Sequence, residues 1–359
     1  MFLNEIVLSL DEATRAGTSF VFGYIGGGSP PFVEKNPGAD FILAFQALPL
    51  VLVIGALSAL LFYWRILPFI VRVLSLLFQK TLNIGGALSL GTATTIFLGM
   101  VEAPLLIKPY LKEMTKSEIF SLMACGMASI AGTVMVLYAT LLQGIIPDPL
   151  GHILVASLIH IPAALTVSRI IVPETGSQTT GTLTPKQTAA GSMDAITKGT
   201  IDALNLLFNI IAMLVVAVAL VHLVNHGLGL LPPVGEKAVT MQMLLGYVMA
   251  PVAWLLSIPW AEAQTAGSLM GTKTILNELL AFIDLSKLPP DALSMRSRLI
   301  MTYVLCSFAN FGSLGIMIGG LGSMMPERRT EIVSLGIRAI IAGTLATCMT
   351  GAVVSFLII

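Results

Sequence analysis

Long runs of apolar residues, separated by short polar segments, extend over most of the chain. Several runs exceed the roughly 18 apolar residues that a helix needs to cross a lipid bilayer. We therefore expect an all-α polytopic membrane protein. The pattern predicts spanning helices over residues 40–64, 117–145, 151–172, 199–229, 297–321 and 332–358.

Other segments are too polar or too irregular to span. Residues 2–15 and 65–80 place charged residues in an amphipathic pattern, which is typical of helices that lie in the membrane interface. Residues 238–258 are apolar but contain Pro251, and we expect them to be interfacial or half-buried. The polar tract at 173–198 predicts a loop.

Two apolar segments, 84–109 and 262–285, are broken into halves that are each too short to span. Glycine and proline interrupt the first at Gly85, Gly86, Gly91, Gly99 and Pro104. Irregular backbone at membrane depth survives only where protein or a watery cavity covers it. Each segment therefore predicts a re-entrant helical hairpin.

The sequence around each predicted hairpin occurs twice. ALSLGTATT at 87–95 resembles GSLMGTKTI at 267–275, and CGMASIAGTV at 125–134 resembles CSFANFGSLG at 306–315. Three predicted spans, an odd number, lie between the hairpins, so the second copy would be inverted in the membrane. Inverted repeats that each carry a re-entrant hairpin and a broken transmembrane helix are typical of secondary transporters.

Composition narrows the class further. Hydrophobic residues make up 56% of the chain and charged residues 11%, against about 25% charged residues in soluble domains. The net charge is zero, so nothing indicates a nucleic-acid partner. We expect a multi-pass protein of the cell (inner) membrane, surrounded by lipid bilayer.

Each copy supplies one acid in apolar surroundings, Glu102 and Glu278, and both are expected to be buried. A buried acid must be paired with a cation, protonated or hydrogen-bonded to a ligand. An ionised carboxylate can accept hydrogen bonds from two hydroxyls of a sugar, and a protonated one can carry a coupling proton. A structural pair with Lys273 is the alternative.

Polar residues also interrupt the spans that follow the hairpins. Ser129 lies in the first copy, and Asn310 and Ser313 share one helix face in the second. Nearby glycines allow the helices to unwind or to pack closely. Phe308 could stack on a planar ligand or lie in the core.

The four histidines give no strong signal. His222 and His226 share a helix face, but two ligands fall short of a zinc site. His160 stands alone in the sequence, and a proton relay is one hypothesis for it. The sequence shows no nucleophile–base pair, so we do not expect an enzyme. No cofactor is expected beyond a coupling ion.

Three stretches carry a resemblance to a known family. GMVEAPLLIKPYLKEMTKSEIF, GTKTILNELLAF and CSFANFGSLGIMIGGLGSMMPERR resemble, in order, the signature stretches of bacterial concentrative nucleoside transporters, and the similarity covers nearly the whole chain. The resemblance implies a homotrimer that imports nucleosides with sodium or protons by an elevator movement. The family's first spans have no counterpart here.

The resemblance also implies roles for individual residues. Ribose hydroxyls would bind Glu278, Asn310 and Ser313, with Asn277 beside them. Phe308 would lie beside the ligand and Val134 against the base, and the first hairpin tip would contribute Gly99, Met100, Val101 and Glu102. Sodium would bind the side chains of Thr95 and Ser129 and the carbonyls of Leu98 and Ile130.

Two departures from the family concern these residues. Met100 and Val101 stand where glutamine and threonine are common, and their apolar side chains offer no hydrogen bond to the base. Thr95 stands where sodium-driven members often have asparagine, which favours protons over sodium. Another small hydroxylated cargo and a non-transporting structural protein are the alternative functions.

The expected organisation has four parts. Residues 1–80 would form part of a scaffold and 81–172 the first transport repeat. Residues 173–235 would form a loop and a scaffold span, and 236–359 the second transport repeat.

Overall fold

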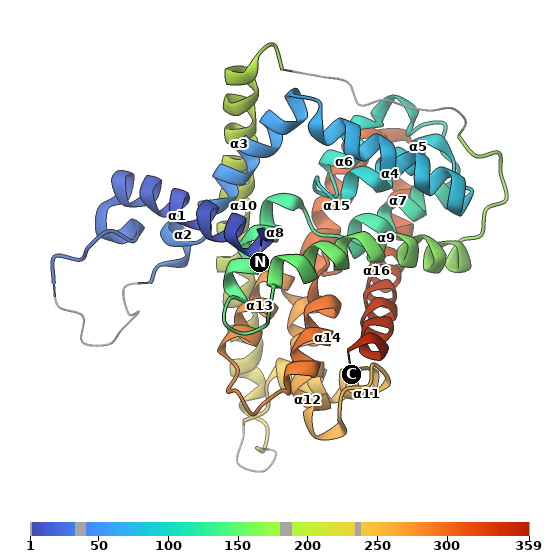
Figure 1. Ribbon diagram of the computed structural model, residues 1–359. Helices are drawn as coiled ribbons and strands as arrows, with labels where there is room; N and C mark the ends of the chain where they lie inside the picture. Colours follow the sequence, from blue (N-terminus) through green and yellow to red (C-terminus); the bar gives the residue numbers. More distant parts are fainter. Residues whose placement is uncertain (1, 33–40, 180–188, 234–237, 359) are drawn as a thin grey trace. The chain divides into compact units, whose positions relative to one another are not determined.

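The computed structural model describes residues 2–32, 41–179, 189–233 and 238–358, and every regular element within these ranges is a helix (Figure 1). The first half contains α1 (Phe2–Phe22), η1 (Gly23–Gly26), α2 (Leu43–Gln46), α3 (Leu50–Tyr63), α4 (Ile66–Leu82), α5 (Gly86–Thr95), α6 (Glu102–Leu106), η2 (Lys108–Tyr110), α7 (Lys116–Ala128), α8 (Gly132–Leu141) and α9 (Pro149–Ile171). The second half contains α10 (Ser192–Leu228), α11 (Met241–Leu255), α12 (Trp260–Ile275), α13 (Glu278–Lys287), α14 (Met295–Leu305), α15 (Phe311–Met324), η3 (Pro326–Arg328) and α16 (Arg329–Leu357).

The two halves have the same order of elements. A span (α2–α3 or α10) is followed by a shorter helix (α4 or α11) and by a pair of helices (α5–α6 or α12–α13). A broken helix (α7–α8 or α14–α15) and an unbroken one (α9 or α16) complete each copy. The predicted repeats, hairpins and broken helices are therefore confirmed.

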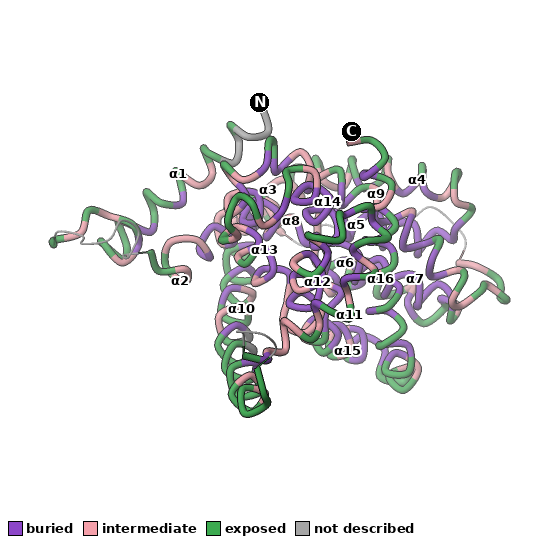
Figure 2. The backbone as a smooth tube through the Cα atoms, turned by 90° about the horizontal axis from the view of Figure 1, so that it is seen from below, coloured by how far each residue is buried: buried purple, intermediate pink, exposed green. Residues whose placement is uncertain are grey.

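Within the described ranges, five helical stretches are long and apolar enough to cross a membrane. These are Leu43–Tyr63, Lys116–Leu141, Pro149–Ile171, Ser192–Leu228 and Pro326–Leu357. Their burial differs greatly (Figure 2): 89% of the most apolar window in Lys116–Leu141 is buried, against 19% in Ser192–Leu228. The broken helix α7–α8 is thus a core element, whereas α10 presents a large apolar surface.

The described chain forms two compact units, and each is considered by itself. The first comprises residues within Met1–Phe69, Gly132–Gly151 and Gln187–Leu214, and the second those within Ile70–Ala131, His152–Lys186 and Val215–Ile359. Of the predicted site residues, Val134 belongs to the first unit and all others to the second. The assignment of chain segments to a scaffold and a transport part stays a prediction.

Helix α16 is central to the packing of the second unit. Its glycines leave room for neighbouring helices: a Cβ at Gly343 would lie 2.7 Å from Cβ of Met127 in α7, and one at Gly351 2.6 Å from Cγ2 of Val304 in α14. Such close approach is a common way for apolar helices to gain packing energy without a polar contact. Both broken helices are therefore held against one unbroken helix.

A hydrogen-bonded clasp fixes the start of the first hairpin and of α7. Thr115 and Glu118 form a capping box, with bonds of 3.0 and 3.1 Å. The second carboxylate oxygen of Glu118 accepts from the hydroxyl of Thr179 at 2.8 Å, and the carbonyl of Thr179 accepts from Gly86 N at 2.8 Å. The segment after α9 therefore holds the first turns of α5 and α7 together.

Two predicted boundaries are wrong. Helix α1 continues to Phe22, beyond the expected end at residue 15. The predicted loop 173–198 ends early, because α10 begins at Ser192, where Asp194 accepts from Ala190 N and pairs with Lys198 at 2.8 Å. Polar residues there extend a span instead of forming a loop, and residues 180–188 of the prediction lie outside the described ranges.

Candidate functional site

The N-termini of two helices of the second unit, α13 and α15, lie side by side. Asn310 is the N-cap of α15, and its Oδ1 accepts a hydrogen bond from Ser313 N at 2.7 Å. Its Nδ2 donates to Oε2 of Glu278, the first residue of α13, at 3.0 Å. Asn277 caps α13 by accepting from Leu280 N at 2.9 Å. One asparagine therefore caps a helix and orients a carboxylate.

The surroundings of this carboxylate favour negative charge. Glu278, Asn310 and Ser313 are 5%, 1% and 8% exposed. The N-terminus of a helix carries about half a positive charge, and here two such ends meet. The three residues expected to bind hydroxyl groups are thus brought together and buried, and Asn310 is oriented by the backbone N–H of Ser313.

Lys273, the alternative partner of the acid, lies at the end of α12. It is 1% exposed, and its Nζ donates to the carbonyl of Val304 at 3.1 Å. Val304 lies in the last turn of α14, where cations are favoured. The lysine thus has a stabilising role of its own at the C-terminus of α14.

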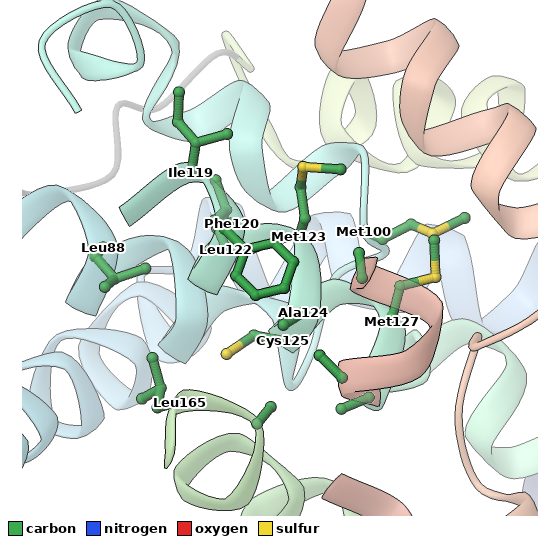
Figure 3. Close-up of a cluster of buried hydrophobic side chains, with 14 of the residues drawn as sticks. Leu88, Met100, Ile119, Phe120, Leu122, Met123, Ala124, Cys125, Met127 and Leu165 are labelled. Carbon is green, nitrogen blue, oxygen red and sulfur yellow. The ribbon is translucent and has the colours of Figure 1, made fainter. Parts of the chain in front are cut away.

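The first hairpin turns at residues 96–101, and its tip is packed into apolar surroundings. Met100 is 7% exposed and belongs to the buried cluster in Figure 3. A Cβ at Gly126 would lie 3.1 Å from both Cβ of Met100 and Cε of Met317, and one at Gly320 would lie 2.7 Å from Cγ1 of Val101. The tip therefore sits on α7 and α15 through glycine contacts.

The expectation that both acids are buried is wrong for one of them. Glu102 is exposed in the first turn of α6, and its carboxylate folds back against Gly99. The helix N-terminus favours the negative charge there. The apolar neighbours in the sequence face the core, as the buried Ala103 and Pro104 do, and a residue of a short helix can point away from them.

The four residues expected to bind sodium lie at the end of α5 and in the break of α7–α8. Thr95 Oγ1 donates to Thr92 O at 2.8 Å, and Ser129 Oγ donates to Gly126 O at 3.5 Å. Thr95, Ser129 and Ile130 are at most 1% exposed, whereas Leu98 is partly exposed. The hydroxyl oxygens keep lone pairs, and a break frees carbonyls. These neutral oxygens fit a hard cation.

A backbone hydrogen bond joins the breaks of the two broken helices. Phe308 N, between α14 and α15, donates to Ser129 O, between α7 and α8, at 3.1 Å. The side chain of Phe308 is partly buried against the core. Val134 lies in α8 of the other compact unit, so its place beside the base stays a prediction.

The sequence interpretation missed one part of the site. Gly320 on α15 lies against Val101 of the hairpin tip, and Met317 lies against Gly126, which also faces Met100 of the tip; both residues continue a face that begins with Asn310 and Ser313. The spacing of three, four and three residues is that of one helix face. This periodicity was available in the sequence and would have placed the tip against α15.

The sequence matches the description "Na+ dependent nucleoside transporter C-terminus" over residues 152–355 and "Nucleoside recognition" over residues 44–144. "Uncharacterized transporter YutK" of Bacillus subtilis is 36% identical over 362 residues, covering 99% of this chain and 86% of that protein. "Nucleoside permease NupC" of Helicobacter pylori is 34% identical, covering 95% and 81%. The chain belongs to the concentrative nucleoside transporter family.

Solved structures of a member of this family have the same fold. CNTnw in an inward-facing substrate-bound state matches with a TM-score of 0.88 and 33% identity, over 98% of this chain and 84% of that one. A CNTnw variant in an outward-facing state matches with a TM-score of 0.87 and 31% identity, over 98% and 83%. The protein is thus a multi-pass membrane transporter, of the inner membrane in bacteria, and not an enzyme.

Proposed function

We propose that the protein is a cation-coupled nucleoside importer whose ribose-binding group is Glu278 with Asn310 and Ser313. The hydrogen bond between Asn310 and Glu278 at two helix N-termini carries the proposal. A carboxylate held in this way can accept from two neighbouring hydroxyls, which is what a ribose offers. The names of the relatives, nucleoside permeases among them, support a nucleoside as cargo.

The coupling ion would bind between the end of α5 and the break of α7–α8. The family description names sodium, and the oxygens of Thr95, Leu98, Ser129 and Ile130 suit it chemically. The backbone bond from Phe308 to Ser129 offers a route for coupling, because ordering one break restricts the other. By linkage, an ion that favours the sugar-binding geometry is itself bound more tightly when sugar is present.

Transport would follow alternating access by an elevator movement of the second compact unit in a homotrimer. The division into two compact units supports a moving part, and CNTnw is known in both inward-facing and outward-facing states. A unit that carries both hairpins, the ribose-binding group and the proposed ion ligands would move them as a single body.

A second cargo class is supported by the hairpin tip. Met100 and Val101 pack on α7 and α15 and offer no side-chain hydrogen bond to a base. A buried base edge without partners costs about 1–3 kcal/mol for each lost bond. Nucleosides with a less polar base, or other small hydroxylated compounds, would then be preferred to uridine.

The test is uptake of radiolabelled uridine and adenosine into proteoliposomes under an inward sodium gradient or an inward proton gradient. We expect concentrative uptake under at least one gradient. The preference between uridine and adenosine shows how the apolar hairpin tip, Met100 and Val101, affects recognition of the base. Folded protein that concentrates neither nucleoside would contradict nucleoside import and leave the other cargo class as the explanation.

A further inference from the structure

His160 lies in the middle of α9 and has no part in the proposed nucleoside or sodium site. It is 0% exposed, and neither ring nitrogen has a hydrogen-bond partner within the described part of the chain. A buried polar group without a partner costs about 1–3 kcal/mol. An ionisable side chain that is kept at this cost inside a membrane span is a candidate functional group.

The surroundings of the ring carry negative partial charge. The backbone of Ala128, Tyr303 and Cys306 comes close to the ring. Ala128 is the last residue of α7, and Tyr303 and Cys306 lie at the end of α14. The last carbonyls of a helix lack helical partners and together carry about half a negative charge. Two helix ends are thus placed to accept hydrogen bonds from a protonated imidazole.

The charge of Lys273 acts on the His160 ring. The lysine Nζ donates to Val304 O at the same end of α14, and it interacts electrostatically with both His160 and Glu278. Two positive charges in such a place repel each other, so a proton on Lys273 makes protonation of His160 less favourable unless the surroundings become more favourable to cations.

The remaining titratable groups nearby add no fixed charge. Cys125 of α7, Cys306 beside α14 and Cys348 of α16 are buried free thiols, which behave as small apolar groups. The hydroxyl of Tyr303 is bonded to Nδ1 of His152, nearer the start of α9, at 3.0 Å. Burial and the charge of Lys273 disfavour a proton on His160, and the backbone at the two helix ends favours one.

We propose that His160 binds a proton that is taken up together with the nucleoside. The proton adds to the ring nitrogen that carries the lone pair, and both N–H groups then donate toward the carbonyls at the ends of α7 and α14. A nucleoside that covers Glu278 displaces water and strengthens the attraction between this carboxylate and positive charge behind it. Nucleoside and proton thus favour each other's binding.

This inference rests on the proposed nucleoside site. The test is calorimetric titration of the purified protein with uridine and with adenosine between about pH 5 and 8, where an imidazole changes charge. Buffers of different ionisation enthalpy report the protons taken up for each nucleoside bound. We expect uptake of up to about one proton per nucleoside in the wild-type protein and none in His160→Asn, with nucleoside binding retained at the alkaline end.

His226→Asn is the matched control, because His226 is an exposed histidine of α10 outside the site. It should take up protons as the wild type does. Proton uptake that persists in His160→Asn, or wild-type binding without any proton uptake, would overturn this inference and leave nucleoside transport standing. Failure of the wild type to bind either nucleoside would overturn both proposals.

A second measurement applies even if His160→Asn does not fold. A variant with asparagine in place of His152, His222 and His226 keeps His160 as its single histidine. The ¹⁵N signals of its imidazole distinguish the neutral from the charged ring. The midpoint of this titration should move to higher pH when nucleoside is added, and an unchanged midpoint would overturn the proposal.

Discussion

The substitution Glu278→Gln tests the proposed ribose site at a single atom. Glutamine has nearly the same shape as glutamate but replaces one acceptor oxygen with an NH2 donor. Asn310 cannot adapt by rotating its amide, because its Oδ1 caps α15 through Ser313 N at 2.7 Å. The carbonyl of the introduced glutamine must therefore accept from Asn310 Nδ2, and its NH2 group is left facing the sugar.

The size of the effect follows from this geometry. The variant loses one charge-assisted hydrogen bond to a ribose hydroxyl, which contributes about 1.5–3 kcal/mol. Each 1.4 kcal/mol changes affinity tenfold, so Kd for the transported nucleoside should rise by about 10- to 150-fold. The neutral bond to Asn310 remains, so the unfolding temperature should change little.

Binding of uridine and adenosine is measured by calorimetry, folding by a thermal melt, and transport by uptake into proteoliposomes. Glu113→Gln is the control, because Glu113 is exposed and outside the site. Wild-type affinity and uptake in Glu278→Gln would refute the assignment of the ribose hydroxyls to this carboxylate. A loss of nucleoside affinity accompanied by a lower unfolding temperature would refute the explanation by one lost hydrogen bond.

Three further substitutions test the surroundings of the site. Gly126→Ala places a methyl group against the hairpin tip and should destabilise the protein by about 1–3 kcal/mol in a thermal melt. The control Gly319→Ala, whose added methyl group would have nothing within 4 Å, should not destabilise it. Equal effects of the two substitutions would contradict the tight contact. Asn310→Asp keeps a side-chain cap but sets a second carboxylate against Glu278, so nucleoside affinity in calorimetry should fall at least about tenfold, and unchanged affinity would contradict their pairing. Thr95→Val removes one proposed sodium ligand and should abolish the sodium dependence of uptake; a retained dependence would place the ion elsewhere.

Most of the fold could be predicted from the sequence, because its signals are local or repeated. Apolar length predicts spans, and the glycine and proline in 84–109 predict a break. The duplicated stretches predict that whatever one copy forms the other forms too. Helix ends were less predictable, since the polar start of α10 depends on a hydrogen bond from Ala190 N to Asp194 that composition does not show.

The site could be predicted only in part. Asn310 and Ser313 were found because their spacing along one helix suffices to place them on one face. The exposure of Glu102 depends on which side of a five-residue helix faces the core, and no periodicity can show that over so short a length. The surroundings of His160 come from helix ends far apart in the sequence, so only the fold reveals them.

The hydrogen bond that joins the two breaks is formed by two main-chain atoms, Phe308 N and Ser129 O. Every residue supplies a carbonyl, and every residue except proline supplies an N–H. Mutation can therefore replace the aromatic ring on one side and the hydroxyl on the other while this hydrogen bond persists. Substitutions during divergence can therefore change the preference for ion or cargo while the hydrogen bond between the two breaks is kept. Proline at position 308 would remove that hydrogen bond, because proline has no backbone N–H.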